Sequence, residues 1–353
     1  MTDRQIKYKK KIYPISAVFT QYLKKHDRSV RMPISYLDLL RFNDSISVYD
    51  DAGDDTLWLR IYFTGEERKE IEFGLKKVYS ILHVDGDNNI IPYLNIDAID
   101  FCTFGNTKPF RIKVRNILND NYVYFYVKQA DASRVYGLEL EEILSPNQVN
   151  FLVEGDTLIE EHIFGIPGDV FVKEHLERLT NIEKVAVSKE FVKFNERCFV
   201  RLLGDMRSYN YVIVKTYDFD RIQYRFRAID FDQQSYEGEV LIYHPYSFKE
   251  NKPLVKMVEE KLTIESIGQY KREERALIAK RAKSNKERLR ELEFCMMEDK
   301  ISLDKNVELL KNYLYKLTKD IRFKKSENMG EILNSSLDFV RRNYENINLY
   351  LNK

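Results

Sequence analysis

The first part of the chain alternates short hydrophobic runs with polar turns, which is the pattern of β-strands. Two such runs, TLWLRIYF at 56–63 and KEIEFGL at 69–75, are separated by the polar segment TGEER. The polar segment VDGDNN at 84–89 predicts a turn before a third run, IIPYLNI. We therefore expect residues 1–95 to form a small strand-rich region with one or two helices.

Three more strands are predicted between residues 97 and 127. The runs AIDFCTF, PFRIKV and YVYFYVK are joined by the short polar connectors GNTK and RNILNDN, as in an antiparallel meander. A helix is expected over 131–144, with Asp131 as its N-cap and a Ser-Pro pair at its end. Two strands, VNFLVEG and TLIEEHIF, follow, and the loop GIPGD leads into a helix over 170–179.

From about residue 190 the pattern becomes helical, apart from one predicted hairpin formed by 209–215 and 223–231. After residue 244 almost every segment is helical and highly charged, and 271–292 is predicted to be one basic helix. A solvated helix face is the ordinary interpretation of such a run. The alternative is a contact surface for nucleic acid or for an acidic partner.

The length of 353 residues is enough for two or three domains. The changes in pattern divide the chain into an accessory region (1–95), a mainly β segment (96–163) and a mainly helical segment (164–353). The sequence therefore predicts an α+β protein.

The composition excludes several classes of protein. The 57 Lys and Arg residues nearly balance the 56 Asp and Glu residues, which is unusual for a protein that mainly coats nucleic acid. The chain has no run of about 18 apolar residues, and no apolar segment of the kind found in a secretory signal follows its basic N-terminal residues. Its scattered cysteines and histidines fit neither a disulfide framework nor a Cys/His metal site. We expect no membrane span and a cytoplasmic location.

The segment from Leu202 to Asp232 carries the groups that phosphoryl transfer needs. Asp205 precedes Asn210, which opens a β-like run, and the second run of the predicted hairpin ends in Ile-Asp-Phe-Asp. In phosphoryl transfer one carboxylate orients or deprotonates the acceptor hydroxyl, while an amide and a second carboxylate hold Mg²⁺ on the phosphate oxygens. A hairpin carrying Asn210 and Asp230, with Asp205 on the loop before it, can bring all three groups together.

This arrangement resembles the protein-kinase-like superfamily, especially its atypical branch of aminoglycoside phosphotransferases, HipA-type kinases and phosphoinositide-type kinases. In these proteins G-D-x-x-x-x-N precedes a hydrophobic strand and an I-D-F/W-G/D/E segment. Here the two segments read GDMRSYN and AIDFD. The resemblance implies that Asp205 is the catalytic base and that Asn210 and Asp230 are Mg²⁺ ligands. Asp232 replaces a common glycine and is implied as a further metal contact.

Residues upstream extend the resemblance over roughly residues 97–245. Lys128 ends the run YVYFYVK, where these kinases have a lysine that pairs with the phosphates. Glu139 or Glu142, on the helix that follows, corresponds to the ion-pair partner of that lysine. The other implied nucleotide contacts lie on a phosphate-covering turn and on a hinge that meets the adenine, namely Gly105, Asn106, Thr107, Glu161, His162 and Ile163.

Two features depart from the family pattern. Leu203 stands where many members have a histidine, and no A-P-E element follows Asp230. A regulated activation segment of the eukaryotic type is therefore not expected.

The resemblance thus implies a bilobal protein-kinase-like fold, with a strand-rich N-terminal accessory region and a helical C-terminal extension. It implies ATP and Mg²⁺ as cofactors, and phosphate transfer to a hydroxyl of an unidentified protein or small molecule. The alternatives are a pseudokinase-like interaction module without catalysis, and nucleotidyl transfer by the same fold.

Overall fold

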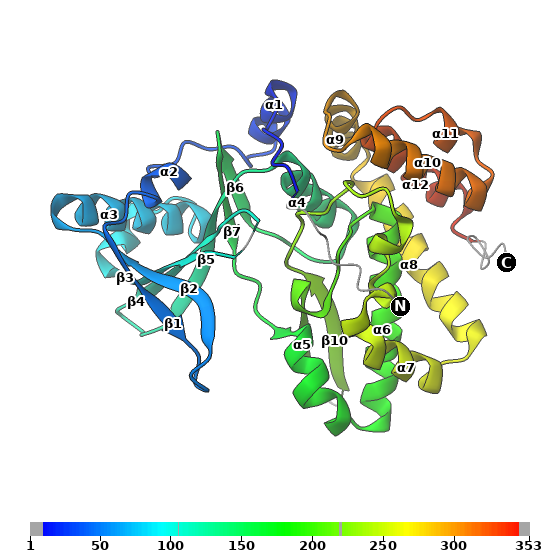
Figure 1. The fold of residues 1–353 in the computed structure, drawn as a ribbon, viewed down its shortest axis with the longest axis horizontal. Coiled ribbons are helices and arrows are strands. Elements are labelled where there is room, and N and C mark those ends of the chain that lie inside the picture. The colour runs from blue at the N-terminus through cyan, green and yellow to red at the C-terminus, as the bar shows by residue number, and fades with distance from the viewer. Residues whose placement is uncertain (1–9, 105, 219–220, 346–353) are drawn as a thin grey trace. The chain divides into compact units, whose positions relative to one another are not determined.

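The computed structural model describes residues 10–104, 106–218 and 221–345 (Figure 1). The protein is a mixed α+β chain with an antiparallel sheet and a helical C-terminal region. It divides into two compact units. The sheet unit comprises Met1–Ala132 and Val149–His162, and the helical unit comprises Ser133–Gln148 and Ile163–Lys353. The chain therefore passes from one unit to the other three times.

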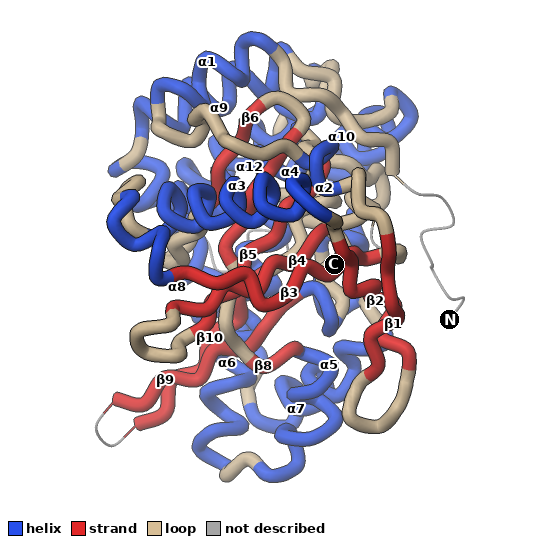
Figure 2. The backbone as a smooth tube through the Cα atoms, turned by 90° about the vertical axis from the view of Figure 1, so that its left-hand side faces the viewer, coloured by secondary structure: helices blue, strands red, loops and turns tan. Residues whose placement is uncertain are grey.

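The sheet unit contains one seven-stranded sheet in the order β1-β2-β3-β4-β5-β7-β6, in which each neighbouring pair is antiparallel. Figure 2 shows its strands in red. The strands are β1 (Asp44–Tyr49), β2 (Asp55–Tyr62), β3 (Leu94–Cys102), β4 (Phe110–Asn116), β5 (Tyr122–Gln129), β6 (Phe151–Glu154) and β7 (Thr157–Glu161). Strands from the predicted accessory region and from the following β segment thus share one sheet.

The sheet unit also contains α1 (Ala17–Lys25), α2 (Tyr36–Leu39), α3 (Gly65–His83) and a 3₁₀ helix (Asn88–Tyr93). The strand predicted at 69–75 is wrong, because this run lies inside α3. Ile71, Leu75 and Val78 are all buried, and their spacing of four and three residues places them on one face of a helix. The run IIPYLNI is likewise not a strand throughout, since β3 begins only at Leu94.

The core of the sheet unit follows the strand alternation that the sequence shows. Phe110, Ile112 and Val114 of β4 are buried, as are Phe125 and Val127 of β5. The intervening residues are more exposed, as expected where one face of a sheet carries the core. The buried side chains of α3 join this cluster.

The helical unit contains a three-stranded sheet in the order β10-β9-β8 and a set of helices around the long helix α6. The strands are β8 (Ile166–Pro167), β9 (Tyr211–Asp218) and β10 (Arg221–Ala228). The helices are α4 (Ala132–Leu144), α5 (Gly168–Val170), α6 (Asn181–Arg201), α7 (Lys252–Lys261), α8 (Ile264–Ser284), α9 (Lys286–Glu298), α10 (Asp304–Thr318), α11 (Ile321–Lys325) and α12 (Met329–Asn343). Short 3₁₀ segments lie at Ser208–Asn210, Val240–Tyr243, Pro245–Ser247 and Lys249–Asn251.

Two helices differ from the sequence prediction. The basic helix expected over 271–292 is two helices, α8 and α9, which meet at Asn285. The Asn285 side chain donates hydrogen bonds to the carbonyls of Arg281 and Ile143. It therefore caps the C-terminal end of α8 and links it to Ile143. The helix expected over 170–179 is irregular and passes from α5 through a π turn into a 3₁₀ turn.

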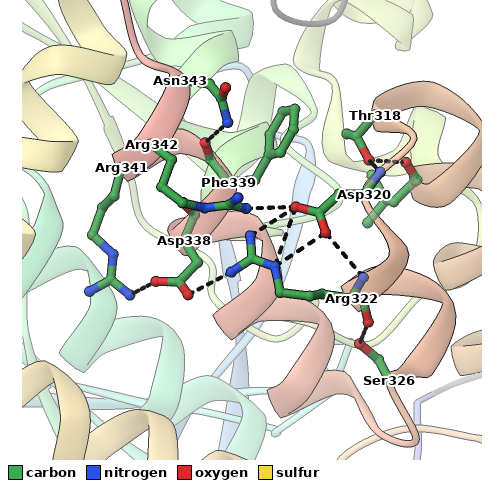
Figure 3. A network of polar contacts seen from close by, with 10 residues as sticks. Thr318, Asp320, Arg322, Ser326, Asp338, Phe339, Arg341, Arg342 and Asn343 are labelled. Atoms are coloured by element: carbon green, nitrogen blue, oxygen red, sulfur yellow. Dashed lines mark hydrogen bonds and ion pairs between the residues drawn. The ribbon is translucent and has the colours of Figure 1, made fainter.

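The last helices of the described chain are joined by a network of charged residues (Figure 3). Asp320 accepts hydrogen bonds from the guanidinium groups of Arg322 (2.9 Å) and Arg342 (2.6 Å). Arg322 also donates to Asp338 (2.7 Å), which pairs with Arg341. The network links the start of α11 to α12, so both helices are held by charge as well as by apolar packing.

Among the described residues, no helix is long and apolar enough to cross a membrane.

Candidate functional site

The loop that follows α6 holds Asp205 in an unusual backbone conformation. Leu202 caps α6 with a φ of 54°, and Asp205 has a φ of 59°. Residues other than glycine are uncommon in this left-handed region, although aspartate tolerates it better than most. The loop is fixed on both sides, because Gly204 N–H donates to the Gln233 carbonyl (3.2 Å) and Asp205 N–H to the Ile242 carbonyl (3.0 Å).

The Asp205 carboxyl group is mostly buried and has a charged partner. Burial raises its pKa to about 6, against the opposing effect of Arg207, and the nearby carboxylates of Asp230 and Glu250 add to the increase. Arg207 donates from Nε to Asp205 (3.0 Å) and from Nη1 to Glu250 (2.8 Å). The result is a carboxylate that is positioned by an arginine and that titrates close to neutral pH.

The hairpin formed by β9 and β10 brings Asn210 and Asp230 to the same end. Tyr211 pairs with Ala228 in the last rung of the ladder, and the Ile229 N–H donates to the Asn210 carbonyl (3.0 Å). Asn210 then turns its amide nitrogen toward the Asp205 carbonyl (2.8 Å). Because the amide nitrogen is used in this way, the amide oxygen is the atom that Asn210 can offer to a cation.

Gly168 allows the start of α5 to pack closely against this hairpin. A Cβ atom at Gly168 would lie 2.4 Å from the Ser208 carbonyl oxygen and 2.3 Å from the Tyr211 ring. Tyr211 in turn donates from its hydroxyl to Asn251 (2.7 Å). The loop carrying Asn210 is therefore held in place by its close packing against Gly168 and by the Tyr211–Asn251 hydrogen bond.

Asp230 and Asp232 are bridged by Arg134 of α4. The Nη1 atom of Arg134 lies 2.8 Å from Oδ1 of Asp230 and 2.8 Å from Oδ1 of Asp232. Its Nη2 atom donates to the Ile229 carbonyl (3.2 Å). The Arg134 side chain is only 3% exposed, whereas the Asp230 side chain is 35% exposed, so the guanidinium is removed from water and one carboxylate faces water.

The chemistry of this donor set suits a hard divalent cation. Carboxylate oxygens of Asp230 and Asp232 and the amide oxygen of Asn210 are the kind of ligands that Mg²⁺ takes, usually together with water and phosphate oxygens. Within the part of the chain that the structure describes, no group of three or more His, Cys, Asp or Glu residues is arranged to hold a metal by itself.

Lys128 lies in the sheet unit and forms a buried ion pair with Glu160. Its Nζ atom is 2.7 Å from Oε2 of Glu160, and both side chains are more than nine-tenths buried. Lys128 is on β5 and Glu160 on the adjacent β7, so the ion pair links two neighbouring strands. The ammonium group also lies 5.2 Å from the centre of the Tyr126 ring.

The helix glutamates predicted to partner Lys128 lie in the helical unit. Glu139 is fully buried and accepts hydrogen bonds from Arg288 of α9 at 2.8 and 2.9 Å. Glu142 is half-buried. The pairing of Lys128 with one of these glutamates stays a prediction.

The residues of the predicted hinge lie at the end of β7 and directly after it. The Glu161 N–H donates to the Asn150 carbonyl (3.0 Å), and the His162 N–H donates to the Tyr124 carbonyl (3.2 Å). The His162 ring is 3.1 Å from the Tyr126 hydroxyl, and burial lowers its pKa. Ile163 begins the second stretch of the helical unit.

In the turn between β3 and β4, Thr107 is buried and Asn106 is half-buried. Gly105 lies outside the described residues.

No protein-family model matches this chain, and no curated protein matches it significantly.

Four residues that the sequence prediction did not include contribute to these charge clusters. Arg207 lies inside the G-D-x-x-x-x-N segment, and its position two residues after Asp205 could have marked it. Glu250, Arg134 and Glu160 are contributed by other elements, far from the residues they contact in sequence. No periodicity or motif in the sequence indicates these partners.

Proposed function

We propose that the protein is a Mg²⁺-ATP-dependent phosphotransferase that acts on a hydroxyl group. The observation that carries the proposal is the convergence of Asp205, Asn210 and Asp230 at one end of the β9–β10 hairpin, with Asp205 titrating near neutral pH. The resemblance of the segments GDMRSYN and AIDFD to atypical kinases supports the same conclusion.

Asp205 would accept the proton of the acceptor hydroxyl. A general base works best when its pKa lies near the working pH, and a value of about 6 leaves Asp205 mostly ionised at pH 7.5 while it remains a useful proton acceptor. Arg207 and the hydrogen bonds to the loop backbone hold the carboxylate in place. Such positioning contributes much of the rate increase in phosphoryl transfer.

Asn210 and Asp230, with Asp232, would hold Mg²⁺. When bound, the metal would neutralise the phosphate oxygens and orient the transferred group. Lys128 is the residue of the sheet unit that the kinase resemblance assigns to the phosphates, and Glu160 holds its ammonium group. A bilobal kinase-like fold is part of this proposal. It is supported by the order of elements along the chain, in which the seven-stranded sheet and α4–α6 come before the β9–β10 hairpin and α7–α12 follow it.

One observation favours a second candidate, an interaction module without catalysis. The Asp230 and Asp232 carboxylates already have a cation, the guanidinium of Arg134, between them. A protein that used this cluster only as a structural ion pair would need neither metal nor nucleotide. Nucleotidyl transfer by the same residues would instead leave a nucleotide, rather than a phosphate, on the acceptor.

The test is the thermal stability of the purified protein with and without Mg²⁺-ATP. A ligand at about one hundred times its Kd stabilises the folded state by about 2.7 kcal/mol. We expect an increase in melting temperature that requires Mg²⁺ and is lost in Asp230→Asn but kept in Asp205→Asn, since Asp205 acts on the acceptor. Asp218→Asn, at the exposed far end of the same hairpin, is the matched control. No stabilisation at millimolar Mg²⁺-ATP would favour the interaction module.

A further inference from the structure

Arg134 lies in the helical unit, and the proposed chemistry does not explain its position. It lies in the first turn of α4 and is buried, yet it contacts three residues of the segment 229–232. A guanidinium group cannot lose its proton under physiological conditions, so Arg134 is a permanent positive charge. That charge lies between the two carboxylates that we propose as metal ligands.

The position of this charge is fixed by the packing of α4. A Cβ atom at Gly137 would lie 2.9 Å from the Phe231 Cβ, so the helix approaches this segment closely. Ser133 donates to the Gln234 carbonyl (2.6 Å), one residue before Arg134. Farther along the helix, Glu139 and Glu141 form ion pairs with Arg288 and Arg201. Arg134 therefore stays next to the carboxylates rather than moving in and out with a flexible loop.

The charges around Arg134 determine how it affects the binding of a divalent cation. Two carboxylates two residues apart repel each other, and a neighbouring cation stabilises both. Here Asp232 is buried and the Asp230 side chain is 35% exposed. The same cation repels Mg²⁺, and in a partly buried cluster this repulsion is only weakly screened. The phosphates of a nucleotide bring several negative charges, which offset the arginine and attract the metal. The cluster therefore discriminates between a bare metal ion and a metal ion that arrives with phosphates.

We propose that Arg134 is a specificity-determining residue that keeps the affinity of Asp230 and Asp232 for a bare divalent cation low, so that metal binds only together with the nucleotide. This inference rests on the proposed function. It predicts that Arg134 makes metal and nucleotide binding interdependent, in contrast to a site in which Mg²⁺ binds first.

The test measures the binding of Mn²⁺, as a substitute for Mg²⁺, without nucleotide. Arg134→Gln is expected to bind Mn²⁺ at least about tenfold more tightly than the unchanged protein, because a buried positive charge next to the metal is gone. Arg134→Lys keeps the charge and should stay within about threefold of the unchanged protein. Arg225→Gln removes an exposed positive charge from the neighbouring strand and is the matched control for net charge.

The outcomes separate the two proposals. If Arg134→Gln binds Mn²⁺ with unchanged or lower affinity, the role of Arg134 is overturned, although Mn²⁺-ATP can still bind in an Asp230-dependent manner. If neither Mn²⁺ nor Mn²⁺-ATP binds any of these proteins, the proposed function fails as well. Should Arg134→Gln prove unfolded by circular dichroism, Arg134→Lys decides, since a tenfold change in its Mn²⁺ affinity would contradict a role based on charge.

Discussion

At the scale of single residues, Asp205 combines two unfavourable features. Its backbone adopts a left-handed conformation, and its carboxyl group is buried deeply enough to raise its pKa to about 6. Residues held in such conformations cost free energy and tend to occur where a function depends on them. Both features fit a residue that is retained for its position and acidity rather than for stability.

We predict that Asp205→Asn stabilises the protein at pH 7.5 by roughly 1–3 kcal/mol. The pKa of Asp205 is higher in the folded protein than its ordinary value of 3.8, so the folded state holds the proton more tightly than the unfolded state. The stability that Asp205 provides is therefore complete below pH 3.8 and falls as the pH rises to about 6. Urea denaturation at pH 7.5 and at pH 3.8 measures this difference, which should nearly vanish at the lower pH. A variant less stable than the unchanged protein at pH 7.5 would contradict the prediction.

The proposed function predicts that the rate of phosphate transfer falls about tenfold per pH unit below pH 6, because the proposed base Asp205 must be ionised to accept a proton. Arg207 lowers the pKa of Asp205, so Arg207→Met should move this acid limb upward by roughly one pH unit. The measurement is kcat/KM against pH for both proteins. An acid limb that stays in place in Arg207→Met would show that Asp205 is not the titrating group.

At the scale of elements, buried ion pairs join α4 to the helices around it. Arg201 at the end of α6 lies 2.5 Å from Glu141, and both side chains are almost completely buried. Burial disfavours ionisation of Glu141, but Arg201 and hydrogen bonds from Ser145 and Asn147 outweigh it and lower the pKa of that carboxyl. A pair of this kind makes the position of α4 depend on α6.

We predict that Arg201→Met lowers the free energy of unfolding by roughly 3–5 kcal/mol, because it leaves the Glu141 carboxylate buried without its cation. The double variant Arg201→Met/Glu141→Gln should be more stable than the single variant, since no uncompensated charge remains. Urea denaturation gives both values. Lys300→Met removes one partner of an exposed pair with Asp304 and should change stability by less than about 1 kcal/mol.

The secondary structure shows where sequence patterns succeed. Strand β4 could be predicted because every second side chain is buried, which produces a clear alternation. Strand β5 could be predicted because its run YVYFYVK is rich in aromatic and β-branched residues. The run at 69–75 misled because KEIEFGL alternates over a few residues, whereas its helical spacing becomes visible only when Val78 is included. A short window cannot distinguish the two periods.

At the scale of the whole molecule, the contacts of the candidate site that could be predicted from the sequence are those between residues close together in the chain. Asp205, Asn210 and Asp230 belong to one loop and hairpin, so their meeting follows from local structure. Arg134 reaches Asp230 from 96 residues away, and its side chain carries no signal of that contact in the sequence. The burial that raises the pKa of Asp205 is likewise a result of tertiary packing.

We predict that residues 163–353 do not fold when expressed alone. This fragment lacks 133–148 and so leaves Arg201, Asp230 and Arg288 without the α4 residues that pair with them. A second polypeptide, in which 133–148 are joined to 163–353 by a glycine-serine linker in place of 149–162, should unfold cooperatively in urea. Cooperative unfolding of 163–353 alone, at the same urea concentration as the linked polypeptide, would contradict the prediction.

The three passages of the chain between the units also bear on how this protein can evolve. Genes that exchange segments by recombination usually need one breakpoint to acquire a new terminal domain. Here the segment 133–148 is encoded between two parts of the sheet unit, although it belongs to the helical unit. Replacing either unit intact by that of a related protein would need three breakpoints. A single breakpoint would separate either α4 from the rest of the helical unit or β6 and β7 from the rest of the sheet unit. The two units are therefore expected to share one line of descent.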